Sequence, residues 1–305
     1  MNLLISTKDS KVYINPYKFR VINCFTEYKM NYDRINIFPL ENINNLNYNN
    51  INNLLLVPFT HINNIWHLMH HLFITYKYIY INKYNSNRIY PIFFKNFYER
   101  QGNILNCQYK DLIFQGMGFS YEYFNDMYNN FSNNNSIKIN KLDLVNEKLN
   151  FNKEELIDNF KIHILSNFNI KYKKNNNKII TFILRRGTRE LTNIEYIKKK
   201  LSNLNYIYLE DYSVKKQLEI ISNTDILIGL HGAGLSWCIF MKKNSLLIEM
   251  YPGNSNTDNY IRWCRIANIN YKRMSINITN GNIRNFRNTT VHMNDNQLNE
   301  LSNLL

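Results

Sequence analysis

The second half of the chain alternates between two patterns of apolar residues. Short runs rich in β-branched and aliphatic residues have the length of buried strands. These runs are 178–184, 206–210, 225–230 and 245–251, with a further short strand at 271–276. The segments between them repeat their apolar residues at helical spacing, at 194–204, 214–224, 235–243 and 259–268. This alternation predicts a parallel sheet with helices on both of its faces.

The first half of the chain is less regular but contains the same two patterns. It predicts strands at 52–59, 89–94 and 110–116 and a helix at 64–79. A polar, Asn-rich stretch begins near residue 135, and a helical segment follows at 152–168. We therefore expect two α/β domains, an N-terminal one at 1–170 and a C-terminal one at 171–305, which leave a cleft between them.

Composition and charge narrow the function classes only slightly. The formal net charge is +14, and a strongly basic chain suggests a polyanionic partner. The lysines, however, are spread along the chain, and the abundance of Asn, Ile, Lys and Tyr is typical of an AT-rich genome. No predicted helix combines a basic face with interleaved aromatic residues, so a nucleic-acid binder is disfavoured. Small phosphorylated ligands fit the charge equally well.

Cysteine spacing and hydropathy bear on the compartment. The four cysteines are far apart in the sequence, so they form neither a metal motif nor a disulfide framework. No signal peptide is visible, and the most apolar window, 72–81, is interrupted by Lys77 and too short to cross a membrane. We expect a cytoplasmic protein without a membrane span.

Charged residues and glycines follow the predicted strands at one edge of the sheet. In a parallel α/β sheet, ligands bind beyond the carboxyl ends of the strands. The segments at these ends are 185–189, 210–211, 231–234 and the stretch that begins with Glu249. The opposite edge has polar turns, one of which contains Lys242 and Lys243 and is expected to be solvated. The asymmetry predicts a ligand site at the carboxyl edge.

The turn at 231–234, with the sequence HGAG, is typical of an anion-binding site. Gly232 and Gly234 would let the backbone approach a ligand closely, and the helix behind them would direct its free N–H groups at that ligand. A diphosphate fits this turn, and Arg185 and Arg189 could add charge-assisted hydrogen bonds. Glu249 could accept hydrogen bonds from ribose hydroxyls. The alternatives are that the glycines only permit close packing and that the arginines are surface charges.

Three enzyme classes compete for this turn. A dinucleotide-binding fold needs GxGxxG after its first strand and an acid about 20 residues later, and the sequence has neither. An esterase needs a GxSxG elbow, which is also missing. A protein that binds a nucleotide sugar remains.

The motifs of the second half resemble those of glycosyltransferase family 61, which includes protein O-linked N-acetylglucosaminyltransferases and plant xylosyl- and arabinosyltransferases. The resemblance is carried by residues 180–275, and upstream by Asn64 and His67 in an N-x-x-H pattern. The matching positions of the second half are Arg185, Arg189, Asn193, Gln217, the HGAGL sequence at 231–235, Glu249 and Tyr251-Pro252. At His71, family members usually carry a carboxylate. The sequence also lacks the signal or anchor of the eukaryotic relatives.

The resemblance implies a GT-B fold, in which two Rossmann-like domains face each other across a cleft. It also implies inverting transfer of a sugar from a UDP-sugar to a hydroxyl of a glycan or protein acceptor, without a metal ion. The absence of a DxD motif in a plausible metal position agrees with this. The residues implied to bind the nucleotide sugar are Arg185, Arg189, Asn193, His231, Gly232, Ala233, Gly234, Leu235 and Glu249.

Inverting transfer needs a general base that takes the proton of the acceptor hydroxyl. We favour His67 for this role, with His71 one helical turn further along the same face. Two alternatives remain open: the two histidines form a structural polar patch, or the chain is a catalytically inactive nucleotide-binding protein of the same fold.

Overall fold

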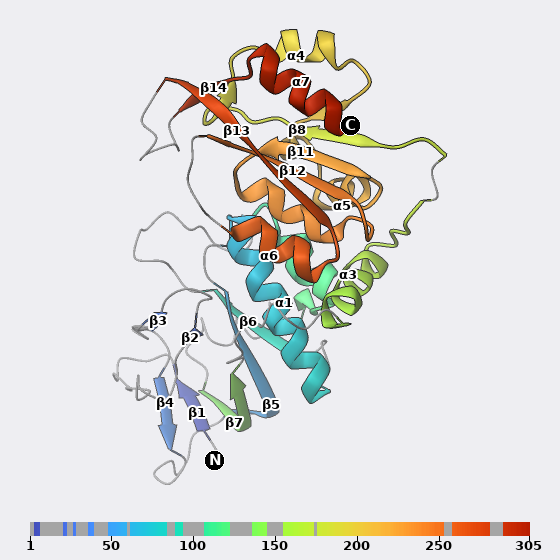
Figure 1. Cartoon of the computed structure of the whole chain (residues 1–305). Coiled ribbons are helices and arrows are strands. Elements are labelled where there is room, and N and C mark those ends of the chain that lie inside the picture. The colour runs from blue at the N-terminus through green and yellow to red at the C-terminus, as the bar shows by residue number, and fades with distance from the viewer. Residues whose placement is uncertain are drawn as a thin grey trace. The chain divides into compact units, whose positions relative to one another are not determined.

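The structure, a computed structural model, divides the chain into two compact units, Met1–Asn150 and Phe151–Leu305 (Figure 1). Side chains are described for residues 62–81, 83, 107–122, 156–173, 176–252, 258–279 and 289–305. The backbone alone is described for Asn82, Glu155 and Asn280 and for the strands of the first unit.

Unit 1 contains a mixed sheet with the strand order β4-β1-β7-β5-β6. These strands are β1 (Leu3–Ser6), β4 (Asn36–Pro39), β5 (Tyr48–Phe59), β6 (Ile89–Phe93) and β7 (Ser136–Leu144). β5 runs parallel to β6 and β7, whereas β1 is antiparallel to β4 and β7. β2 (Val21–Ile22) and β3 (Glu27–Tyr28) form a separate antiparallel pair. The strands predicted at 52–59 and 89–94 are confirmed as β5 and β6.

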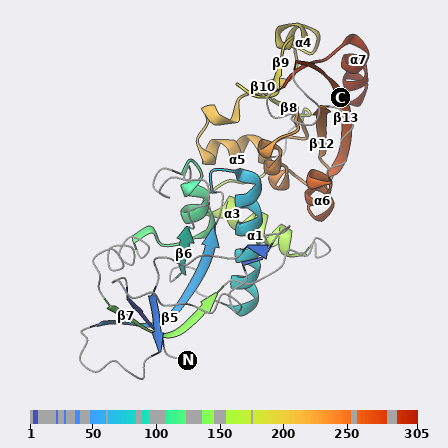
Figure 2. The ribbon, with the colours of Figure 1, turned by 90° about the vertical axis from the view of Figure 1, so that its left-hand side faces the viewer.

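Helix α1 (Ile65–Asn82) follows β5 and packs beside it (Figure 1 and Figure 2). Asn64 caps its start, because Oδ1 accepts a hydrogen bond of 3.1 Å from the backbone N–H of Trp66. The helix ends at Lys83, which has a left-handed φ of 54°. The face that forms part of the core carries Leu68, Met69, Leu72 and Phe73. The helix predicted at 64–79 is therefore confirmed.

The segment 110–116, for which the sequence predicts a strand, forms a helical turn instead. A π-helix spans Leu112–Gly116, and the side chains of Leu112, Ile113 and Phe114 are buried. A short apolar run does not distinguish a buried strand from a buried helical turn, because both require apolar residues on every side.

In the described part of unit 2, seven strands form one sheet in the order β10-β8-β11-β12-β13-β14-β9. The first five pair in parallel: β10 (Asn205–Ile207), β8 (Ile180–Ile183), β11 (Ile226–Leu230), β12 (Leu246–Pro252) and β13 (Asn270–Asn280). β14 (Thr290–His292) is antiparallel to β13, and β9 (Glu190–Leu191) is parallel to β14. The predicted α/β class is confirmed, but the sheet is mixed because the chain turns back after β13.

Helices cover both faces of this sheet (Figure 1). On one face, α4 (Ile194–Lys200) and α7 (Asp295–Leu304) contribute Ile197, Leu298 and Leu301 to the core. On the other, the 3-10 helix η6 (Ala233–Phe240) contacts α5 (Val214–Ser222) and α6 (Asn259–Ile266). The helix predicted at 235–243 is thus the 3-10 helix η6. Its residues from Leu235 to Phe240 are all buried, as expected for a helix that is apolar on every side.

Helix α3 (Glu155–Asn167) belongs to unit 2. The buried Lys161 donates a hydrogen bond of 2.8 Å from Nζ to the carbonyl of Met241, and Lys243 pairs with Asp158 at 2.6 Å. These contacts tie α3 to the end of η6. The boundary that the sequence places near residue 170 therefore lies after α3, whereas the compact units divide before it.

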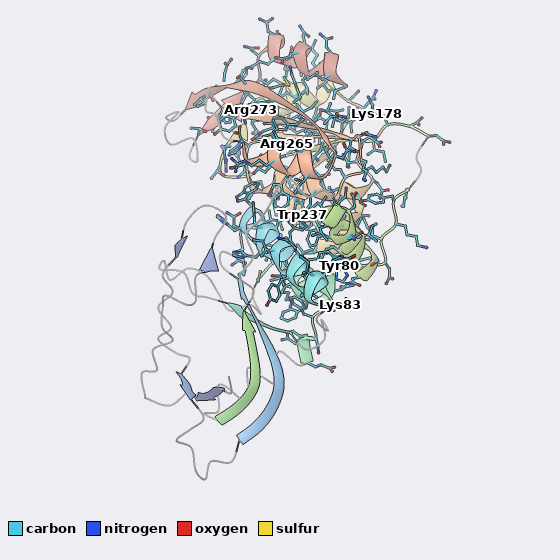
Figure 3. All side chains as sticks on the ribbon, turned by 60° about the horizontal axis from the view of Figure 1, so that its bottom comes forward. Tyr80, Lys83, Lys178, Trp237, Arg265 and Arg273 are labelled. Carbon is cyan, nitrogen blue, oxygen red and sulfur yellow. The ribbon has the colours of Figure 1, made fainter. Side chains whose placement is uncertain are left out.

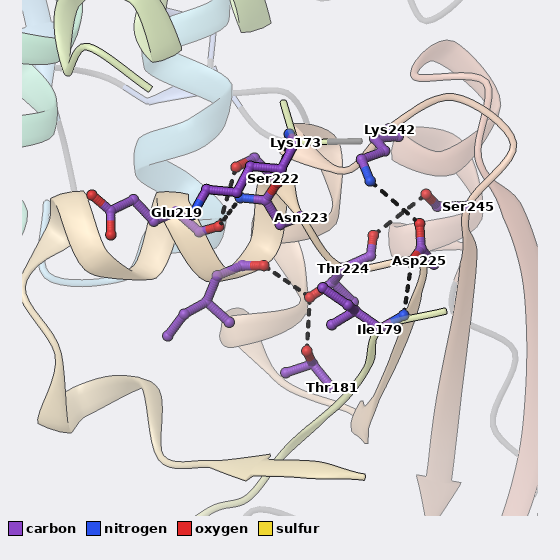
Figure 4. A network of polar contacts seen from close by, with 11 residues as sticks. Lys173, Ile179, Thr181, Glu219, Ser222, Asn223, Thr224, Asp225, Lys242 and Ser245 are labelled. Carbon is purple, nitrogen blue, oxygen red and sulfur yellow. Dashed lines mark hydrogen bonds and ion pairs between the residues drawn. The ribbon is translucent and has the colours of Figure 1, made fainter. Parts of the chain in front are cut away.

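Polar contacts close the amino edge of the unit 2 sheet (Figure 4). Asp225 accepts a hydrogen bond of 2.8 Å from the N–H of Ile179 and pairs with Lys242 at 3.5 Å. The hydroxyls of Thr181 and Thr224 lie 2.7 Å apart and are fully buried. These side chains form hydrogen bonds and ion pairs with one another and with the backbone, so the polar contacts at this edge stabilise the fold. Lys242, expected in a solvated turn, is instead part of these contacts.

Candidate functional site

The carboxyl ends of β8, β11 and β12 meet at one edge of the unit 2 sheet. β11 lies between the other two strands, and Gly229 is paired with Ile183 on one side and Glu249 on the other. Arg185 follows β8, and His231 follows β11 directly. The parallel register therefore brings the arginine segment, the HGAG turn and Glu249 together, although they are far apart in the sequence.

Gly232 leaves room for the guanidinium of Arg185. A Cβ atom on Gly232 would lie 1.9 Å from Arg185 Nη1 and 2.9 Å from Cζ, much closer than any van der Waals contact. The φ of Gly232 is 165°, an extended value open to any residue, so the need for glycine is steric. At Gly234 the nearest atom to such a Cβ would be Leu209 Cδ1 at 3.4 Å. Of the two glycines, Gly232 is the one that this packing requires.

Arg185 is held in place by its own loop. Its Nε donates to the carbonyl of Thr188 and its Nη2 to the hydroxyl of the same residue, both at 3.2 Å. Burial lowers the pKa of Arg185, and nearby Tyr260 and Glu210 oppose this effect. An arginine remains charged even so. The loop thus keeps a cation against the backbone of the HGAG turn.

Arg189 and Tyr260 hold two carbonyls of the turn. Arg189, with a left-handed φ of 55°, donates from Nη1 to the carbonyl of His231 at 2.6 Å. Tyr260 donates to the carbonyl of Gly232 at 2.5 Å, and burial raises its pKa so that it stays a protonated donor. In a trans peptide the C=O and the following N–H point in opposite directions. The N–H groups of Gly232 and Ala233 therefore point away from these two donors.

The start of η6 adds to this arrangement of N–H groups. The first intrahelical bond runs from the N–H of Leu235 to the carbonyl of Gly232, at 2.9 Å. The N–H groups of Ala233 and Gly234 precede that bond, so the helix itself provides no acceptor for them. Both residues are half-buried. Together with the adjacent guanidinium, this end of η6 can hold an anion.

His231 and Glu249 form a buried pair behind the turn. The carboxylate of Glu249 has no exposed surface: Oε1 is in hydrogen-bonding contact with Nδ1 of His231, and Oε2 accepts a hydrogen bond from the hydroxyl of Tyr271. Arg273 (labelled in Figure 3) lies with its Nε 3.0 Å from the Tyr271 hydroxyl and 3.9 Å from Glu249 Oε2. The ribose contact predicted for Glu249 would need an exposed oxygen, and both of its oxygens are buried and occupied.

Two other residues implied by the family motifs have structural contacts. Asn193 donates from its amide to the carbonyl of Met293 at 2.7 Å and accepts from the N–H of Met293 at 3.3 Å. Leu235 is buried and packs against Gly229, where a Cβ atom would lie 2.9 Å from its Cδ2. Asn193 therefore fastens the β9–α4 turn to the segment before α7, and Leu235 belongs to the core.

The histidines of α1 lie in unit 1. His67 is half-buried, and His71 is almost fully buried. His70 is also buried, and its Nδ1 lies 2.7 Å from the carbonyl of Trp66. Burial lowers the pKa of His70 to about 4, against the usual 6.5, so this ring is neutral at pH 7. His70 is therefore a residue of the core.

The described residues contain no group of three or more His, Cys, Asp or Glu side chains placed to hold a metal ion. No helix among them is both long and apolar enough to cross a membrane.

Sequence reasoning missed Tyr260, Tyr271 and Arg273. The first two donate hydrogen bonds to the turn and to Glu249, and the third donates to Tyr271. A signal exists for two of them: Tyr271 and Arg273 alternate along a strand, so they share one face of the sheet, and Arg273 is paired in register with Glu249. Tyr260 has no comparable signal.

Comparison with known proteins places this chain among the glycosyltransferases. A family model described as Glycosyltransferase 61 matches residues 12–248, and the chain belongs to that family. It is 30% identical over 78 residues to the alpha-1,3-arabinosyltransferase XAT2 of Oryza sativa subsp. japonica, covering 24% of this chain and 13% of that protein.

Two further relatives are named as N-acetylglucosamine transferases rather than as an arabinosyltransferase. The chain is 31% identical over 122 residues to the EGF domain-specific O-linked N-acetylglucosamine transferase of Canis lupus familiaris, covering 37% of this chain and 23% of that protein. It is 33% identical over 54 residues to the protein O-linked-mannose beta-1,4-N-acetylglucosaminyltransferase 2 of Xenopus tropicalis, covering 18% and 9%. Each alignment thus spans less than a quarter of the relative's length.

Proposed function

We propose that the protein is an inverting glycosyltransferase that transfers a sugar from a UDP-sugar to a hydroxyl of a glycan or protein acceptor, without a metal ion. Membership of glycosyltransferase family 61 supports glycosyl transfer. The named relatives transfer arabinose or N-acetylglucosamine, so sugars of both sizes are candidates for the donor.

The observation that carries this proposal is the packing of Arg185 on Gly232 at the carboxyl edge of the sheet. A diphosphate leaving group needs positive charge and N–H donors at a fixed position. The guanidinium of Arg185 and the N–H groups at the start of η6 supply both within one turn. Arg189 supports the same turn through the carbonyl of His231, so in this proposal it acts on the diphosphate partly by shaping the backbone.

For the acceptor side we propose a GT-B arrangement of two Rossmann-like domains, with His67 as the general base. A histidine with its ordinary pKa near 6.5 can take a proton close to neutral pH. Asn64 supports this assignment, because as the N-cap of α1 it fixes the first turn that carries His67. His71, where the family usually has a carboxylate, is the second candidate for the base.

A catalytically inactive nucleotide-binding protein is the competing function. The presence of His71 in place of a carboxylate favours it, since a lost base would leave donor binding intact. The two functions differ in turnover and agree in UDP binding.

The deciding experiment measures UDP binding and UDP release on the full chain. Isothermal titration calorimetry should detect UDP binding that Arg185→Ala weakens, whereas Arg265→Ala, which removes an exposed arginine of α6, should leave it unchanged. UDP release from a panel of UDP-sugars, with glycan and peptide acceptors and with EDTA present, then tests for metal-independent transfer. UDP binding without release under any condition supports the inactive protein, and no UDP binding at all refutes both functions.

A further inference from the structure

We propose that Tyr271 and Arg273 on β13 are positioning residues, which act through Glu249 to fix the ring of His231 with a proton on Nδ1. This inference rests on the proposed function, because His231 is the first residue of the turn assigned to the donor diphosphate. Both residues lie beyond the segment 12–248 that matches the family model.

The carboxylate of Glu249 is the centre of this arrangement. It has no exposed surface, and burying an ionised carboxylate is costly unless hydrogen bonds and a counter-charge compensate it. One oxygen contacts Nδ1 of His231 and the other accepts from Tyr271, while Arg273 Nε lies 3.9 Å from Oε2. Both oxygens are therefore occupied, and the positive charge stands beside the oxygen that faces Tyr271.

The chemistry of Arg273, Tyr271 and Glu249 fixes which group donates each hydrogen bond from Arg273 to His231. A guanidinium has only donors, so Arg273 donates to the Tyr271 oxygen across 3.0 Å. Burial and the nearby Glu249 raise the pKa of Tyr271, so its hydroxyl keeps its proton and donates to the carboxylate. An ionised carboxylate only accepts. His231 must then be the donor on the other side, with its proton on Nδ1.

His231, the last residue in this series of contacts, lies at the sheet edge where the ligand is expected. About 10% of the His231 side chain is exposed, in contrast to the fully buried Glu249. The rings of Tyr251 and Tyr260 lie against it, with centroids at 4.5 Å and 5.5 Å. Ring packing restricts the plane of the imidazole but does not distinguish its two nitrogens. The bond to Glu249 does, and Nε2 is thereby directed toward the opposite side of the ring.

Nuclear magnetic resonance of the full chain, labelled with 15N at histidine, tests this arrangement without any ligand. The His231 signals are identified by their loss in His231→Gln. At pH 8 we expect long-range 15N–1H spectra to show a protonated Nδ1 at His231. In Tyr271→Phe, Glu249 loses one donor and can rotate, so the His231 signals should shift toward a mixture of the two tautomers. Tyr206→Phe is the matched control. It removes a tyrosine hydroxyl of another strand, β10, which donates a hydrogen bond of 2.9 Å to the carbonyl of Leu201.

UDP affinity provides the second readout. Tyr271→Phe should raise the Kd for UDP about tenfold, the lower end of the effect of one hydrogen bond to a charged group. Arg273→Gln should act in the same direction, and Arg273→Lys, which keeps the charge near Glu249, should have a smaller effect. The two Arg273 variants also cover the case in which Tyr271→Phe does not fold.

Three outcomes overturn the inference. The first is a His231 ring protonated only on Nε2 in the unsubstituted protein. The second is unchanged His231 signals in the folded Tyr271 or Arg273 variants, and the third is a UDP affinity in those variants equal to that of Tyr206→Phe. If UDP does not bind the unsubstituted protein, the proposed function fails, while the tautomer spectra still decide whether the positioning exists.

Discussion

The guanidinium of Arg185 lies where a side chain on Gly232 would begin. A Cβ atom at Gly232 would be 1.9 Å from Arg185 Nη1, so any substitution of Gly232 must also move the side chain of Arg185. The obstructed atom is the end of a flexible side chain, whereas the backbone around Gly232 is extended and unstrained. A small side chain at Gly232 would therefore displace Arg185 without unfolding the sheet.

We predict that Gly232→Ala keeps the fold but weakens UDP binding as much as Arg185→Ala does. The double variant should be little weaker than either single variant, because both remove the same contact. Calorimetric Kd values for the four proteins measure this coupling. Gly234→Ala, whose Cβ would meet only Leu209 at 3.4 Å, should have a smaller effect. Fully additive losses in the double variant would contradict the coupling.

Substitution of Arg185 and of Arg189 should differ in its effect on the stability of the protein. Arg185→Ala is expected to weaken UDP binding by about 1.5–3 kcal/mol, the scale of a hydrogen bond to a charged group, with little change in melting temperature. Arg189→Ala should weaken binding and also lower the melting temperature, because Arg189 holds the carbonyl of His231 at 2.6 Å. Melting curves recorded beside the titrations separate the two effects. Unchanged binding in both variants would show that neither arginine contacts the nucleotide and that their roles are structural.

Asn193 tests whether a family motif residue acts on the ligand or on the fold. Its amide makes two hydrogen bonds to the backbone of Met293, and their loss leaves buried polar groups unsatisfied. Asn193→Ala should therefore lower the free energy of unfolding by about 1–3 kcal/mol. The Kd for UDP, measured where the variant is folded, should stay within about twofold of the original. A large loss of affinity at full stability would show direct contact with the nucleotide.

The general base is tested by His67→Ala and His71→Ala. If His67 is the base, its loss should cut turnover by about 10²–10⁴, the usual scale of general base catalysis, with little loss of UDP affinity. The rate of the unsubstituted enzyme should also fall on the acid side as the imidazole becomes protonated. A larger defect in His71→Ala would assign the role to His71 instead.

Steady-state rates with saturating donor distinguish these cases. His163→Ala, which changes a half-buried histidine of α3, provides the control for a histidine outside the proposed site. If both α1 variants keep full turnover, the base lies elsewhere, and the exposed Asp258 at the start of α6 is the next candidate.

Burial of His70 predicts a pH dependence of stability. Its pKa is about 4 in the folded protein and 6.5 ordinarily, so between these values the unfolded chain binds a proton that the folded chain does not. Stability should therefore be full above pH 6.5 and fall as the pH drops toward 4, by roughly 3 kcal/mol for this group. His70→Leu should remove this part of the slope. Urea unfolding at pH 7 and pH 4.5 measures it, and equal slopes in both proteins would refute the prediction.

The α/β architecture of the second half follows from local patterns. Strands of four or five buried residues and helices with 3.6-residue periodicity are each encoded within a dozen neighbouring positions. The segment 110–116 shows where this fails, because its apolar run is only three residues long, Leu112 to Phe114, and is too short to show a period. The predicted boundary near residue 170 and the division into compact units differ because α3 is fixed to unit 2 by Lys161 and Lys243, and side-chain partners of this kind have no local signature.

The sequence by itself determined the family, the parallel strands and the edge at which charged residues collect, because the motif residues and the alternation of strands with helices carry that information. Only the tertiary structure decided what each of those residues contacts. Glu249, expected at a ribose, is buried between His231 and Tyr271, and Arg185 lies against Gly232. Register between strands and the direction of a side chain depend on residues distant in the sequence, whose packing is settled only when the sheet is assembled.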